Sequence, residues 1–95
     1  MILIVDDDKA VRLSLSVSLR HSGYEVMAVE GPDEALAAVR ARCPDLVIMD
    51  MNFGGGTDGA DGLALLQRVK VLCPGTPVIL ITAWGSIPLA VEGVK

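Results

Sequence analysis

The chain has 95 residues, a formal net charge of −4 and 52% hydrophobic residues, but only one Trp, one Tyr and one Phe. This length allows one small domain, whose core must be built from Leu, Val, Ile and Ala. The acidic balance argues against a nucleic-acid-binding segment. No apolar run approaches the roughly 20 residues of a membrane span, and the N-terminus lacks the pattern of an export signal, so we expect a cytoplasmic protein without membrane contact.

The first half of the chain predicts strands at residues 2–6 and 24–29, each followed by a helix. The first helix is expected to be capped by Asp7 or Asp8 and to end at Gly23. Its inward face is predicted to contain Val11, Leu15, Ser18 and Leu19, with Leu13 and Val17 off this face and partly exposed. A second helix begins near Pro32 and is predicted to bury Ala35, Leu36 and Val39.

The second half repeats this alternation. Strands are expected at 45–49 and 78–81, separated by a glycine-rich loop (53–62) and a helix with Leu63, Leu66 and Val69 inward. Ser86 can cap a last helix. Alternating strands and helices predict right-handed crossovers and a parallel sheet, and therefore an α/β fold.

Oxygen-bearing residues stand at the ends of three predicted strands: Asp6 and Asp7, Asp50 and Asn52, and Thr82. The carboxyl ends of parallel strands meet at one edge of a sheet, where open α/β folds bind ligands. Carboxylates that close repel each other unless a cation or proton neutralises them, so the pattern predicts a divalent metal site. The alternative for Asp6, Asp7 and Asp8 is helix capping and solvation.

Mg²⁺ suits such an open edge, because it takes few protein oxygens and keeps several waters. Asp50 is best placed to accept a phosphoryl group as an acyl phosphate, and Thr82 could donate its hydroxyl to that group. The same acids could also serve a phosphotransfer enzyme that uses an aspartyl intermediate. The glycine-rich loop lacks the Gly-Lys-Ser/Thr ending of a nucleotide-binding P-loop.

Three segments together resemble the receiver domain of two-component response regulators. They are Val5-Asp6-Asp7-Asp8, Val47-Ile48-Met49-Asp50-Met51-Asn52 and Ile79-Leu80-Ile81-Thr82-Ala83. The resemblance implies that Asp50 is the phosphoacceptor and Thr82 the switch hydroxyl. It also implies an Mg²⁺ site with Asp7 and Asp50 as ligands, Asp6 acting through a water and Asn52 through its backbone carbonyl.

The resemblance further implies a flavodoxin-like (CheY-like), doubly wound parallel sheet of strand order 2-1-3-4, and a sensor histidine kinase as phosphoryl donor. Residues 52–59, 82–86 and 90–92 are similar to receivers of NtrC-type transcription activators. Family members add a fifth strand, ending in a lysine, and a fifth helix. Residues 1–95 are therefore expected to be a C-terminally incomplete receiver domain. Lys95 falls at a helix position and is not assigned the role of that lysine.

Two further expectations concern association and the cysteines. The fourth strand would be an open edge able to pair or swap with a second copy, and a non-phosphorylated pseudo-receiver that only docks or dimerises is the alternative function. Cys43 and Cys73 each precede a proline and share no metal-ligand spacing with His21. We expect them to be two reduced thiols near helix ends.

Overall fold

The computed structural model describes residues 1–50 and 60–81, in which four parallel strands alternate with three helices. The strands are β1 (Ile2–Val5), β2 (Val26–Val29), β3 (Leu46–Asp50) and β4 (Val78–Ile81). The helices are α1 (Lys9–His21), α2 (Pro32–Ala41) and α3 (Ala60–Leu72). The predicted last helix lies outside the described residues.

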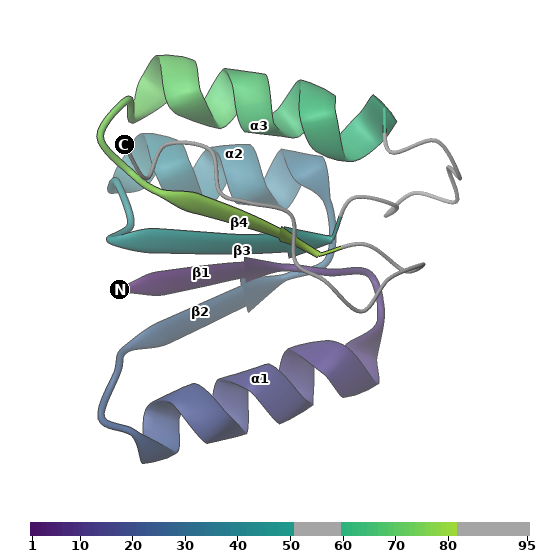
Figure 1. The fold of residues 1–95 in the computed structure, drawn as a ribbon, viewed down its shortest axis with the longest axis vertical. Helices are drawn as coiled ribbons and strands as arrows, with labels where there is room; N and C mark the ends of the chain where they lie inside the picture. Colours follow the sequence, from purple (N-terminus) through teal and green to yellow (C-terminus); the bar gives the residue numbers. More distant parts are fainter. Residues whose placement is uncertain (51–59, 82–95) are drawn as a thin grey trace.

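The sheet order is β2-β1-β3-β4, as the resemblance implied. Helix α1 lies on one face of the sheet, and α2 and α3 lie side by side on the other (Figure 1). All four strands point to the same edge, so the chain reverses direction through each helix (Figure 1). None of the helices in the two described ranges is long and apolar enough to cross a membrane.

The hydrophobic core lies between the sheet and the α2–α3 layer. All four residues of β1 are buried, as expected of a strand with helices on both faces. Strands β3 and β4 instead alternate, with Val47, Met49, Val78 and Leu80 buried in the core shared with α2 and α3. The intervening residues Leu46, Ile48, Ile79 and Ile81 are only half-buried.

The ends of α1 are as the sequence predicts, but one position of its inward face is not. The Asp8 carboxylate accepts hydrogen bonds from the backbone N–H groups of Ala10 and Val11, and Gly23 follows the C-cap at φ 96°. Ser18 is exposed and Ser16 is buried, so the prediction for Ser18 was wrong. Leu13 and Val17 are exposed, which confirms the prediction that they lie off the inward face.

Helix α3 differs from its prediction in start and in phase. It begins at Ala60, inside the segment predicted to be loop. Leu63 is 43% exposed, whereas Leu65 is 2% exposed, so the expected inward position of Leu63 was wrong. Because the run Leu63-Ala64-Leu65-Leu66 is apolar on every side, its periodicity alone could not fix which residues face the sheet.

Cys43 and Cys73 form a disulfide bond, so the expectation of two reduced thiols was wrong. Cys43 lies in the α2–β3 loop and Cys73 directly follows α3. Because α2 and α3 lie side by side, their ends bring the two Cα atoms within 5.8 Å. The sequence carried a signal, since both cysteines open a Cys-Pro step followed by an apolar strand. They therefore occupy equivalent places in adjacent βα units.

Candidate metal and phosphoacceptor site

The pairing of β1 with β3 brings the acids together. Val5, the last residue of β1, pairs with Met49, so Asp6 and Asp50 follow at neighbouring positions of the same edge. This is the edge to which the strand arrows point in Figure 1. The alternation of buried and half-buried residues in β3 favours this register, since a shift by one residue would turn the buried side chains of β3 to the opposite face.

Asp6, Asp7 and Asp50 form the candidate site. Each offers a carboxylate oxygen, and these oxygens all lie within 4.8 Å of one another. Asp6 is buried, Asp50 half-buried and Asp7 exposed, so the cluster opens from the protein interior towards solvent. The prediction that these three acids meet in space is confirmed, whereas Asp8 caps α1 instead.

The electrostatics of Asp6 reflect this crowding. Burial raises the pKa of its carboxyl above the ordinary value. The hydrogen bond from the Asp8 backbone N–H opposes this rise in pKa, and the negative charges of Asp50, Asp7 and Asp8 add to it. The protein therefore holds acids together at an electrostatic cost that a bound cation would offset.

These donors suit a hard divalent cation. Mg²⁺ binds oxygen at about 2.0–2.1 Å, so two ligands on opposite sides of the ion lie about 4.2 Å apart. The carboxylate oxygens, which lie within 4.8 Å of one another, are spaced on this scale. The three carboxylates would hold the ion.

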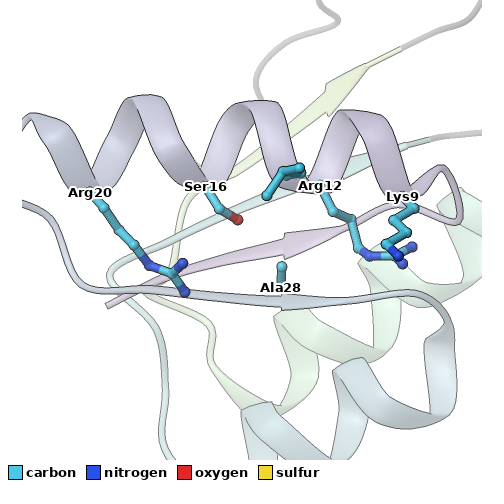
Figure 2. A pocket seen from close by; sticks show the side chains of 6 residues that line it. Lys9, Arg12, Ser16, Arg20 and Ala28 are labelled. Atoms are coloured by element: carbon cyan, nitrogen blue, oxygen red, sulfur yellow. The ribbon is translucent and has the colours of Figure 1, made fainter.

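Arg12, which the sequence did not single out, contacts the backbone beside this site. The Arg12 guanidinium donates a hydrogen bond of 2.7 Å to the backbone carbonyl of Asp6 and lies 4.0 Å from the Glu30 carboxylate. Figure 2 shows Arg12 and Arg20 reaching from α1 along an open groove beside β2, with Ser16 between them. The available signal was an arginine one turn inside the helix that follows the acidic strand end.

Two predicted site residues, Asn52 and Thr82, lie outside the described residues, so their roles stay predictions. His21 is exposed in the last turn of α1, far along the chain from the acids. Among the predicted site residues, those that the structure describes are Asp6, Asp7 and Asp50.

Comparison with known proteins identifies the family. Residues 2–95 match the model of the response regulator receiver domain. The chain is 34% identical over 94 residues to the C4-dicarboxylate transport transcriptional regulatory protein DctD of Rhizobium meliloti, covering 99% of the chain and 20% of DctD. The chain thus spans about a fifth of this relative.

Solved structures agree. The receiver domain of NtrX from Brucella abortus matches with a TM-score of 0.76 and 38% identity, over 84% of this chain and 65% of that one. A response regulator from Burkholderia pseudomallei, solved with a phosphorylated aspartic acid, a calcium ion and citrate, matches with a TM-score of 0.78 and 27% identity, over 90% of this chain and 48% of that one. The chain therefore belongs to the response regulator receiver domain family.

Proposed function

We propose that this domain accepts a phosphoryl group on Asp50 with the help of Mg²⁺, as the receiver of a two-component response regulator. The observation that carries this proposal is the meeting of Asp6, Asp7 and Asp50 at the carboxyl edge of the sheet. The phosphorylated aspartic acid and the calcium ion of the Burkholderia pseudomallei relative support it.

The reaction is a phosphoryl transfer between a kinase histidine and a carboxylate. An oxygen of Asp50 attacks phosphorus, the P–N bond of the phosphohistidine breaks, and its electron pair stays on the imidazole, which takes a proton from water. Bound Mg²⁺ would neutralise charge on the transferring oxygens. Asp6 and Asp7 would hold the ion, Asn52 would add its backbone carbonyl, and the Thr82 hydroxyl would bind the phosphoryl group.

The partner and the output follow from this chemistry. A sensor histidine kinase would supply the phosphoryl group, and the relatives' transcriptional roles point to a transcriptional output in the cytoplasm. The domain would act as an acceptor, without turning over a separate substrate. β4 is one of the two outer strands among the described residues, and pairing of its edge with a second copy stays a prediction.

Phosphorylation of the complete chain tests the proposal. The chain is incubated with a small-molecule phosphoryl donor such as acetyl phosphate, with and without Mg²⁺, and incorporated phosphate is counted by intact mass. We expect one phosphoryl group per chain, dependent on Mg²⁺ and absent in Asp50→Asn. Asp45→Asn, an exposed acid at the opposite edge, is the matched control and should be phosphorylated normally.

The other functions predict different results. A phosphotransfer enzyme would release phosphate continuously beyond one equivalent, and a docking module would incorporate none. Either result would contradict the proposed function.

A further inference from the structure

The Cys43–Cys73 bridge is accessible from one side only. Cys43 is exposed, whereas Cys73 is 3% exposed and belongs to the hydrophobic core cluster. A thiol from solvent can therefore reach the Cys43 sulfur, with Cys73 as the leaving group. Attack on the Cys73 sulfur is blocked by the packing around it.

The two loops are also held together without the bridge. The Thr76 hydroxyl donates a buried hydrogen bond of 2.8 Å to the carbonyl of Pro44, and the Val47 N–H donates one of 3.0 Å to the carbonyl of Pro77. Both bonds join the segment around Cys43 to the segment after Cys73. Reduction would therefore leave the two thiols close enough to be oxidised again.

The redox state of a disulfide depends on the cellular compartment in which the protein lies. Disulfides in cytoplasmic proteins are usually transient and redox-sensing, because cellular thiols reduce them. The proposed function places this domain in that compartment, and the inference rests on it. Moreover, the bridge closes a loop of sequence separation 30 that contains β3, Asp50 and α3, so opening it would remove a restraint on the unfolded form of this segment.

We propose that Cys43 and Cys73 are a reversible redox site, opened by a low-molecular-weight thiol such as glutathione and closed by its disulfide. In the first step the thiolate attacks the Cys43 sulfur, the Cys43–Cys73 bond breaks, and Cys73 leaves as a thiolate that takes a proton. A second thiolate then attacks the outer sulfur of the mixed disulfide and releases Cys43. The protein gains two protons and two electrons, and two thiols become one disulfide.

Equilibration in glutathione buffers tests the proposal. The complete chain is held at a series of reduced-to-oxidised glutathione ratios that includes the cytoplasmic range, then alkylated, and its free thiols are counted by mass. We expect both thiols to appear together, with the midpoint inside that series. A pair that stays fully oxidised or fully reduced across the whole series would overturn the proposal.

Thermal unfolding gives a second readout. Because a bridge of this span restrains the unfolded chain, the melting temperature should fall by more than about 10 °C between the oxidised and reduced ends of the series. The double variant Cys43→Ala/Cys73→Ala is the control and should melt at one temperature in every buffer. A wild-type melting temperature that does not change when the thiol count changes would contradict the restraint.

Single variants show which of the two sulfur atoms a thiol attacks. Glutathione disulfide should modify Cys43 in Cys73→Ala, and modify Cys73 in Cys43→Ala at least about tenfold more slowly because of its burial. Should a single variant fail to fold, the mixed disulfide trapped in the wild-type chain during reduction identifies the attacked sulfur, and its presence on Cys73 would count against the proposal.

Failure here is distinguishable from failure of the proposed function. The double alanine variant keeps all three acids, so its Mg²⁺-dependent phosphorylation is measured in the same samples. Normal phosphorylation with an unresponsive thiol pair would reject only the redox site.

Discussion

The Arg12 guanidinium donates a hydrogen bond of 2.7 Å to the backbone carbonyl of Asp6, the most buried acid of the cluster. This bond joins α1 to the end of β1 at the point where the chain leaves the sheet. Asp6 is thus held from two sides, since its carboxylate also accepts a hydrogen bond from the Asp8 N–H. The helix that follows the first strand therefore helps to position the acid site.

Arg12→Lys should weaken Mg²⁺ binding. Lysine keeps the positive charge but lacks the planar group that reaches the Asp6 carbonyl, so the change isolates geometry from charge. We expect up to roughly tenfold weaker binding, as for other residues that orient metal ligands, and a loss of about 1 kcal/mol in unfolding free energy. Calorimetric Mg²⁺ titration and denaturant unfolding measure the two effects.

Arg20→Lys is the matched control for this experiment. Arg20 also reaches from α1 to a backbone carbonyl of the sheet, that of Val26, at 3.1 Å and at the far end of the helix (Figure 2). It should cost similar stability without changing Mg²⁺ affinity. Equal losses of affinity in both variants would contradict a specific role for Arg12.

Asp6→Asn should stabilise the metal-free protein while weakening Mg²⁺ binding. The amide oxygen can still accept the hydrogen bond from the Asp8 N–H, but the buried charge beside Asp50 and Asp7 disappears. Melting temperatures with and without Mg²⁺ check this expectation. We expect a higher value than wild type without Mg²⁺ and a smaller rise on adding it.

The difference in stability between Asp6→Asn and the wild type should depend on pH, because the pKa of Asp6 is raised in the folded protein. A group whose pKa is higher in the folded state binds more protons there, so its stabilising contribution is complete below the unfolded pKa and is lost as pH rises through the folded pKa. In the absence of metal, the advantage of Asp6→Asn should therefore vanish below the ordinary pKa of 3.8 and grow above it. An advantage that grows on acidification would contradict the assignment.

Two leucines of α3 test the phase of that helix. Leu65 is 2% exposed and Leu63 is 43% exposed. Leu65→Ala should cost about 2–5 kcal/mol of unfolding free energy because it leaves a cavity in the core. Leu63→Ala should cost less than about 1 kcal/mol. Denaturant unfolding of both variants measures the difference, and comparable costs would show that α3 is turned differently.

Gly23 should be sensitive to substitution for a conformational reason. Its φ of 96° is unfavourable for residues with a Cβ, although no atom lies within 4 Å of the position that a Cβ would take. Gly23→Ala should therefore cost about 1–2 kcal/mol through the backbone alone. Gly75→Ala is the control, because Gly75 has equal space and no such φ, and its effect should stay under about 1 kcal/mol.

The sequence predicted the fold and the acid cluster well because both follow from strand ends. Strands that alternate with helices must run parallel, and parallel strands bring Asp6, Asp7 and Asp50 to one edge. Cap residues such as Asp8 and Gly23 could be predicted because they act locally. These features need only the chain's own periodicity and its polar ends.

The wrong or missing predictions concern features that are determined by tertiary packing. Leu63 and Leu65 both lie in an apolar run, and only contact with the sheet selects one of them. The repeated Cys-Pro step places Cys43 and Cys73 at equivalent positions, but their pairing also depends on which helices are neighbours, and the step does not specify that. The hydrogen bond of Arg12 also depends on tertiary structure, since the sequence does not show which backbone carbonyl an arginine on a helix will contact.

Isothermal titration of the complete chain with Mg²⁺ tests whether Asp6, Asp7 and Asp50 share one cation. We expect one site per chain, weakened in each of the variants Asp6→Asn, Asp7→Asn and Asp50→Asn and unchanged in Asp45→Asn. Wild-type affinity in Asp7→Asn or Asp50→Asn, or no Mg²⁺ binding by the wild-type chain, would contradict it.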